Sequence, residues 1–322
     1  MEIAWVGDPE LVRNVDRVFR STAGATAVAV VTPQREMTAT VGSDQHSTFE
    51  LGSISKVLTG MLYRDVTERG LISQTTFLRE LLPLEGHREI GSVSLSSLAI
   101  HRSGLPSLPP GMHPLRRTLK LWIKGENPYG DSLADLLDQT RNLRIGAPRP
   151  RYSNLGFQLL GHAVATAAGS SYEKLLQNVL GDEFRTPTRT NDLWPADLTG
   201  VNRFGRPRAA WVGEAIAPAG GVRATISTMR GFLRSVLDGT ARGVSALHPV
   251  ADFSPRVRIG AGWITLEHEG RHITWHNGST GGFSSWIGLD RNAGVGVVVL
   301  TACHESVDRQ GFRLLTEFTT PS

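Results

Sequence analysis

The sequence has little cysteine, no long apolar run and no strong excess of charge of one sign. Cys303 is the only cysteine, which excludes an intramolecular disulfide and a cluster of thiolate metal ligands. No apolar run is long enough to span a membrane. The first residues include acids and show no basic region followed by an apolar one, so no secretory signal is visible and we expect a cytoplasmic protein.

Basic residues exceed acidic ones only by 34 to 30, and most of them are scattered along the chain. No aromatic stacking pattern or recognition helix accompanies the two arginine-rich stretches at 141–151 and 203–208, so we expect no nucleic acid partner. The 322 residues, 40% hydrophobic and 20% charged, suit a soluble globular protein with one large domain or two interleaved ones. The oligomeric state is not readable.

A serine and a lysine open the most informative helix of the chain. Apolar residues recur at helical spacing after Ser53, and Gly70 stands where a helix C-terminus favours glycine, which predicts a helix from Ser53 to Arg69. Lys56 then shares a face with Ser53, near enough to accept or relay the hydroxyl proton. The positive end of the helix would favour the attacking oxygen. This pattern indicates an activated nucleophile.

The S-x-x-K pattern alone is weak, because a capping serine followed by a solvated lysine explains it without chemistry. Two further stretches change the balance. One is Tyr152-Ser153-Asn154, between a turn rich in Gly and Pro and an apolar helix. The other is the run His276-Asn277-Gly278-Ser279-Thr280-Gly281-Gly282.

Together the motifs resemble those of the serine β-lactamase and penicillin-binding protein superfamily, in particular the class C β-lactamase and D,D-peptidase branch. His276 stands where this group usually has lysine and Asn277 where it usually has threonine, which is similar to the esterase-like and D-aminopeptidase-like members. The resemblance implies catalysis by Ser53, Lys56 and Tyr152, with an oxyanion hole formed by the N–H groups of Ser53 and Ser279. It implies substrate contacts from Asn154, His276, Asn277 and Gly278. No cofactor and no metal are implied.

The favoured hypothesis is a serine hydrolase or acyltransferase that acts on a small ester or amide through an acyl-enzyme on Ser53. One alternative is a penicillin-binding-like sensor that acylates without turnover, and another is a D-amino-acid peptidase or β-lactamase. Because the third motif offers an amide and a largely neutral histidine, uncharged substrates should be favoured over carboxylates, and Asn277→Thr should narrow the gap. Arg223 would alter this expectation if it projected into the cleft.

For the fold, we expect the α/β class of α+β type: an antiparallel sheet flanked by terminal helices, with a mostly helical inserted domain, as in β-lactamase and transpeptidase folds. Residues 1–74 and 251–322 would form a discontinuous α/β domain and residues 75–250 the helical one, with the active site at their junction. Asp8 and Pro9 predict the start of a first helix. The strand that carries His276 should lie at a sheet edge facing Ser53.

Histidines invite two other interpretations. His268, His272 and His276 would align on a helix as metal ligands, but Glu269-Gly270 between two β-rich runs predicts a hairpin, and no carboxylate cluster stands nearby. His101 lies at a helix end before a Gly-Leu-Pro turn, so we interpret it as a structural, hydrogen-bonded residue.

Overall fold

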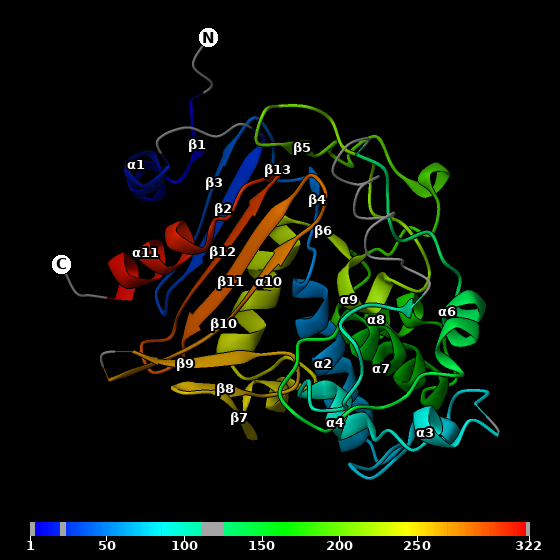
Figure 1. Cartoon of the computed structure of the whole chain (residues 1–322). Helices are drawn as coiled ribbons and strands as arrows, with labels where there is room; N and C mark the ends of the chain where they lie inside the picture. Colours follow the sequence, from blue (N-terminus) through cyan, green and yellow to red (C-terminus); the bar gives the residue numbers. More distant parts are fainter. Residues whose placement is uncertain (1–3, 20–23, 85, 111–124, 269, 320–322) are drawn as a thin grey trace.

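The computed structural model describes residues 4–19, 24–84, 86–110, 125–268 and 270–319. A nine-stranded sheet, antiparallel throughout, has helices on both faces (Figure 1). Its strand order is β1 (Val6–Gly7), β3 (Glu36–Val41), β2 (Thr26–Val31), β12 (Val295–Thr301), β11 (Ser284–Asp290), β10 (Arg271–Ser279), β9 (Ile264–His268), β8 (Val257–Ile259) and β7 (Ala251–Ser254). Strands from both ends of the chain therefore form one sheet, because β2 pairs with β12. The predicted fold class is confirmed.

The sheet is buried on both faces at its centre, and each face has its own core. Along β2, Val28 and Val30 pack in one core cluster, whereas Ala27, Ala29 and Val31 pack in the other, as the alternation of a strand requires. Two terminal helices, α1 (Pro9–Val18) and α11 (Asp308–Thr319), cover the first face. The helix α10 (Ile226–Leu237) covers the second face at β2 and β12.

Helix α1 begins where the sequence predicts. Pro9 is its first residue, and the Asp8 carboxylate accepts hydrogen bonds from the N–H groups of Glu10 and Leu11. These bonds satisfy two donors that the first turn of a helix leaves without an intrahelical partner.

Between β3 and β7 the chain is mainly helical. Helix α2 (Ile54–Glu68) packs against α7 (Asn154–Ala167), α8 (Tyr172–Leu180) and α9 (Ala217–Gly220). The other described elements of this region include β4 (Thr48–Glu50) paired with β6 (Arg223–Thr225), the helices α3 (Arg88–Gly91), α4 (Leu95–Ala99) and α6 (Leu133–Thr140), and the 3₁₀ turns η1 (Leu78–Glu80), η3 (Thr190–Asp192) and η4 (Val244–Leu247). Strand β5 (Val201–Asn202) also lies here and pairs with β13 (Cys303–His304), which follows β12.

The division into domains at residues 74 and 250 stays a prediction. The structure places α10, from the predicted helical part, directly on the sheet, while α2 packs among the helices. The segment 115–123, which belongs to the part predicted to be mostly helical, lies outside the described residues. No described helix is long and apolar enough to cross a membrane.

The prediction that the strand with His276 lies at a sheet edge is wrong for the sheet as a whole, because β9, β8 and β7 continue the sheet beyond β10. However, β9 pairs with β10 only between Arg271 and Trp275. From His276 to Ser279, β11 is the only described strand that pairs with β10. This half of the strand therefore has an open side that can face a substrate.

Candidate active site

Ser53 stands at the N-terminus of α2, where its hydroxyl is directed toward two other side chains. Its side chain makes no capping hydrogen bond to the helix. The Tyr152 hydroxyl donates to Ser53 Oγ at 2.7 Å, and Lys56 Nζ lies 3.0 Å from the same oxygen. A serine that only caps a helix would use its oxygen on a backbone N–H. This serine instead contacts two groups that can carry its proton.

Lys56 is completely buried, with 0% of its surface exposed, which rules out the solvated lysine of the simpler interpretation. Its ammonium nitrogen also donates to the Ala219 carbonyl and lies 4.9 Å from the centre of the Tyr152 ring. No described carboxylate forms an ion pair with it. Burial lowers the pKa of Lys56 well below its ordinary value of 10.5, because the charged form loses its hydration. The geometry thus supplies an amine that can be neutral, and therefore basic, beside the serine.

Tyr152 presents a protonated phenol to Ser53. Burial raises the pKa of Tyr152 above its ordinary value of 10, and the hydrogen bond with Ser53 opposes this effect only in part. Ser153 fixes the backbone after it: its hydroxyl donates to the Pro106 carbonyl at 2.6 Å and accepts from the Gly156 N–H at 2.9 Å, which caps α7.

His101 packs against Tyr152 and holds the loop that carries it. Its ring centre lies 4.7 Å from that of Tyr152, and its Nδ1 accepts the Ser153 N–H at 3.2 Å. Burial lowers the pKa of His101, so its ring is neutral and able to accept this bond. These contacts agree with the structural role that the sequence predicts for His101.

His276 lies on the face of β10 that carries the site. It pairs in register with Ile287, which packs in the core cluster on the α10 face of the sheet. Its ring centre is 6.3 Å from that of Tyr152. Only 2% of its surface is exposed. Burial lowers the pKa of His276 to about 4, and its Nδ1 donates to the Asn277 carbonyl. At neutral pH His276 therefore brings no positive charge to the site.

Asn277 requires a correction. Residues next to each other on a strand point to opposite faces, and Asn277 pairs in register with Trp286, which packs in the core cluster of the terminal helices. Its side-chain amide donates to Asp308, at the start of α11, at 2.8 Å. The Asn277 side chain is thus held on the far face of the sheet. Asn277→Thr would remove this bond rather than add a hydroxyl to the cleft.

Gly278 and Gly52 allow the two motif backbones to meet. A Cβ atom on Gly278 would lie 2.1 Å from the Leu51 carbonyl oxygen and 2.9 Å from the Ser53 nitrogen. One on Gly52, whose φ is +51°, would lie 2.6 Å from the Ser279 nitrogen. Real Cβ atoms do not approach so closely, so only glycine permits this contact at either position.

Register indicates where the Ser279 N–H points. The Thr280 N–H donates to the Phe283 carbonyl at 3.0 Å, so the neighbouring pair Ser279 and Ser284 is a non-hydrogen-bonded one. The Ser279 N–H therefore points away from β11, to the open side of β10. The structure records no hydrogen bond from the Ser53 N–H to any described residue. The oxyanion hole formed by these two N–H groups is compatible with this register and stays a prediction.

Asn154 is the first residue of α7, two residues after Tyr152. Its Oδ1 is buried and has no hydrogen-bond partner among the described residues. The side chain also lies beside Tyr129, whose pKa burial raises to about 12. An unused amide oxygen next to Tyr152 is compatible with the predicted contact to a substrate N–H, which stays a prediction.

Arg223 does not project into the cleft. Its guanidinium is 1% exposed, lies 2.9 Å from Glu50 Oε1 and 3.2 Å from Asp197 Oδ1, and donates to the Leu198 carbonyl at 3.0 Å. These contacts hold β4, β6 and the chain around residue 197 together. The cation that the sequence left open as a substrate ligand is used inside the protein.

His304 is a neighbour of the site that the sequence motifs do not indicate. Its Nδ1 donates to the Thr280 carbonyl at 2.7 Å and lies 3.1 Å from Ser279 Oγ. The ring therefore holds the turn that presents the Ser279 N–H. No spacing rule relates it to Ser53, because β13 is brought there by the sheet. Within the described part of the chain, no three His, Cys, Asp or Glu side chains are grouped as a metal site would require.

A comparison with protein-family models identifies the family of this chain. The model of the family described as Beta-lactamase matches residues 15–316. The chain belongs to the Beta-lactamase family. This membership places it in the serine β-lactamase and penicillin-binding protein superfamily, among the β-lactamase-like serine hydrolases.

Two relatives match this chain at low sequence identity. A "Beta-lactamase-like protein" of Arthroderma benhamiae is 25% identical over 319 residues, covering 84% of this chain and 51% of the relative, so the chain spans about half the length of that protein. The "D-alanyl-D-alanine-carboxypeptidase/endopeptidase AmpH" of Escherichia coli K12 is 23% identical, covering 88% of this chain and 76% of the relative.

Solved structures share the fold. A class C β-lactamase from Rhodobacter sphaeroides superposes with a TM-score of 0.79 at 20% identity, covering 97% of this chain and 100% of the other. A second class C β-lactamase gives a TM-score of 0.80 at 18% identity, covering 97% and 98%. At such identities the likeness concerns the fold.

Proposed function

We propose that the protein transfers acyl groups from small esters or amides through a covalent intermediate on Ser53. The observation that carries this proposal is the placement of Ser53 Oγ within 2.7 Å of the Tyr152 hydroxyl and 3.0 Å of Lys56 Nζ. A nucleophile needs a nearby base, and a leaving group needs a nearby acid. Both are present here on one oxygen.

In the first half of the reaction, neutral Lys56 takes the Ser53 proton while Oγ attacks the carbonyl carbon. The oxygen of the tetrahedral intermediate accepts hydrogen bonds from the N–H groups of Ser53 and Ser279, each worth roughly 3 kcal/mol at comparable sites. Collapse breaks the bond to the leaving group, which takes the phenolic proton of Tyr152. The Lys56 ammonium then returns a proton to Tyr152. Water or another acceptor attacks the acyl-enzyme by the same steps in reverse.

The substrate preference follows from charge. His276 is neutral at pH 7, Asn277 faces the other side of the sheet, and Arg223 is held in buried ion pairs. None of these three residues therefore offers a cation to a substrate carboxylate. A carboxylate buried without such a partner loses hydration, at a cost of about 1 to 3 kcal/mol. We therefore propose that uncharged short-chain esters or amides are the better substrates.

A matched pair of esters tests this proposal. Nitrophenyl butyrate and the mono-nitrophenyl ester of glutaric acid have similar acyl chains, but only the second ends in a carboxylate. We expect kcat/KM to be roughly 5- to 150-fold higher for the neutral ester, the ratio that corresponds to about 1 to 3 kcal/mol. Equal or faster turnover of the glutarate ester would contradict the charge argument and favour a carboxypeptidase-like assignment.

A D-amino-acid nitroanilide and a chromogenic cephalosporin belong in the same assay, with Ser53→Ala as the control for background hydrolysis. Turnover of either one, lost in that variant, would assign the peptidase or β-lactamase activity instead. An acyl adduct that persists for hours without turnover would indicate a ligand-binding module.

A further inference from the structure

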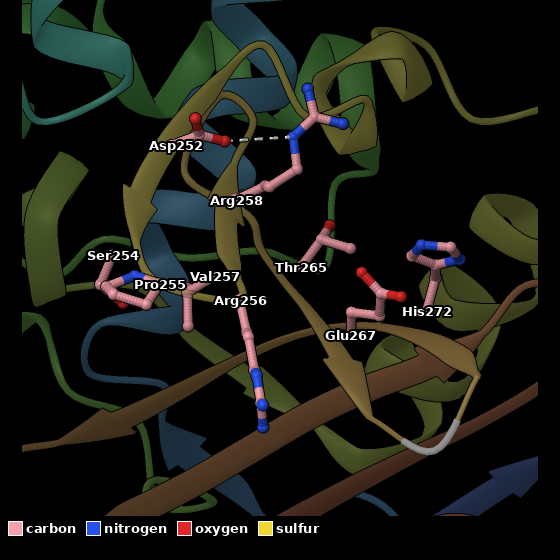
Figure 2. Close-up of a pocket in the computed structure, with 9 residues that line it drawn as sticks. All are labelled: Asp252, Ser254, Pro255, Arg256, Val257, Arg258, Thr265, Glu267 and His272. Carbon is pink, nitrogen blue, oxygen red and sulfur yellow. Dashed lines mark ion pairs between the residues drawn. The ribbon is translucent and has the colours of Figure 1, made fainter.

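A second cavity lies at the outer strands of the sheet, apart from Ser53. Its volume is about 430 Å³, and it is bounded by β7, β8, β9 and the start of β10 (Figure 2). The lining side chains used below are Asp252, Arg256, Arg258, Thr265, Glu267 and His272. None of them takes part in the proposed acyl transfer. The volume is within the range of about 300 to 1,000 Å³ that small-molecule pockets occupy.

Strand register places this cavity on the same face of the sheet as His276. Asp252 pairs with Arg258, and Arg258 with Thr265. Thr265 pairs with Thr274, which is two residues before His276 and so points to the same face. From His272 to His276 the strand advances about 14 Å, at about 3.4 Å per residue. The cavity is therefore separate from the catalytic serine but opens on the same side of the molecule.

The row of side chains changes from core to surface as it crosses the strands. Thr274 is 0% exposed and Thr265 4%. The Asp252 and Arg258 side chains are 85% and 57% exposed. The cavity thus has a buried floor at β9 and an open rim at β7, which is the shape of a site that a small molecule can enter from solvent.

Two unpaired charges of opposite sign line the cavity. The Asp252 carboxylate and the Arg258 guanidinium form an exposed ion pair, with Oδ1 and Nε 3.7 Å apart. By contrast, no ion pair or side-chain hydrogen bond joins Arg256 or Glu267 to any described residue. In Figure 2 the Glu267 carboxylate lies toward Thr265 and His272, whereas the Arg256 side chain extends away from them. The two charges are therefore offered at separate points of one cavity.

The main chains of Arg256 and Glu267 are neighbours, although their side chains diverge (Figure 2). The Glu267 N–H donates to the Arg256 carbonyl at 3.3 Å across the strands. Arg256 has a φ of +62°, a left-handed conformation that is uncommon for residues other than Gly, Asn and Asp. The turn after β7 therefore fixes where the Arg256 side chain leaves the backbone.

We propose that this cavity binds a small zwitterion, with the ligand's carboxylate at Arg256 and its ammonium group at Glu267. A free amino acid or a dipeptide has this chemistry and fits the volume. Because ion pairs between exposed groups are weak, we expect dissociation constants no tighter than about 1 mM. The inference does not depend on the proposed acyl transfer, because it concerns binding alone.

Calorimetric titration of the full chain with three related peptides tests the proposal. Glycylglycine carries both charges, N-acetylglycylglycine lacks the ammonium group and glycylglycinamide lacks the carboxylate. We expect each blocked peptide to bind at least threefold more weakly than glycylglycine. Similar dissociation constants for all three peptides would overturn the proposal. So would the absence of glycylglycine binding at a peptide concentration about ten times the expected dissociation constant.

Variants assign the contacts. Arg256→Asn removes the guanidinium while asparagine tolerates the left-handed backbone. Arg256→Asn should therefore bind glycylglycinamide and glycylglycine with similar dissociation constants. Glu267→Gln should bind N-acetylglycylglycine and glycylglycine with similar dissociation constants. Arg13→Gln, an exposed arginine on α1, is the matched control and should bind like the wild type. If both variants still bound the blocked peptides more weakly than glycylglycine, by the same factors as the wild type, the assignment of the two contacts would be contradicted.

Ser53→Ala separates this inference from the proposed function. Glycylglycine should bind this variant with the wild-type dissociation constant, whatever the outcome of the ester assays. Loss of binding in Ser53→Ala would place the peptide at the catalytic serine and overturn the second site.

Discussion

At the scale of single residues, the proposed chemistry depends on the burial of one amine. Lysine in water is protonated at neutral pH and cannot accept the proton of a serine. Lys56 is enclosed by α2, α9 and the Tyr152 ring, with no described carboxylate to stabilise its charge. Its pKa is lowered for this reason. The spacing of Ser53 and Lys56 is visible in the sequence, whereas the burial that makes the pair reactive is a property of the fold.

Replacement of Lys56 should remove the base. Lys56→Met keeps the length and the apolar stem, and we expect turnover of nitrophenyl acetate to fall by about 100- to 10,000-fold, as for other general bases. Lys56→Arg should lose as much, because a guanidinium cannot deprotonate in a protein. Circular dichroism confirms that each variant is folded. A Met variant within threefold of the wild type would show that Lys56 is not the base.

The pH dependence of activity has a defined sign. Lys56 acts in its neutral form, so wild-type activity should fall as the pH is lowered through its folded pKa. The residual activity of Lys56→Met should lack this decline.

His276 should make stability depend on acid. Its pKa is about 4 in the folded protein and 6.5 in the unfolded chain. Between these values the unfolded chain binds more protons, so its contribution is fully present above pH 6.5 and is lost as the pH falls toward 4. The 2.5-unit difference corresponds to roughly 3 kcal/mol. Urea unfolding at pH 7 and pH 4 measures the loss of unfolding free energy between these pH values. This loss should be smaller in His276→Gln than in the wild type by about that amount. An equal loss in both proteins would contradict the assigned pKa.

At the scale of elements, the site depends on two backbones that meet without side chains between them. The turn before α2 and the end of β10 touch at Gly52 and Gly278. The sequence shows both glycines, but it does not show that they face each other. It also does not show the alternation of β10 relative to the site, which turns His276 toward Tyr152 and Asn277 toward α11. For this reason the predicted role of Asn277 was wrong.

Gly278→Ala tests this contact. The new methyl group would meet the Leu51 carbonyl oxygen at 2.1 Å, so the backbone that carries the oxyanion donors must shift. We expect kcat for nitrophenyl acetate to fall by about 100-fold or more, which is the effect of losing one oxyanion donor. Gly231→Ala is the matched control, because a Cβ there meets nothing within 4 Å and lies in α10. Comparable activity in the two variants would show that the close approach is not needed.

At the scale of the whole molecule, the strongly patterned helices and strands could be predicted from the sequence, but the way in which they pair and pack could not. Strongly periodic segments such as α1, α2 and α7 could be predicted because burial imposes their patterns. The short strands β7 and β8 were not, since their residues are partly exposed and carry charges. As a result, the position of β10 inside the sheet and the cavity beside it were missed. His304 was missed because long-range pairing alone brings β13 to the site.

The central claim is that Ser53 is the nucleophile, and covalent labelling tests it most directly. After treatment with a fluorophosphonate, we predict a mass increase of one adduct per chain, mapped by peptide mass spectrometry to Ser53. The adduct should be absent in Ser53→Ala and should form at least 100-fold more slowly in Lys56→Met. Labelling at another serine, or no labelling of a protein that hydrolyses nitrophenyl acetate, would contradict the account.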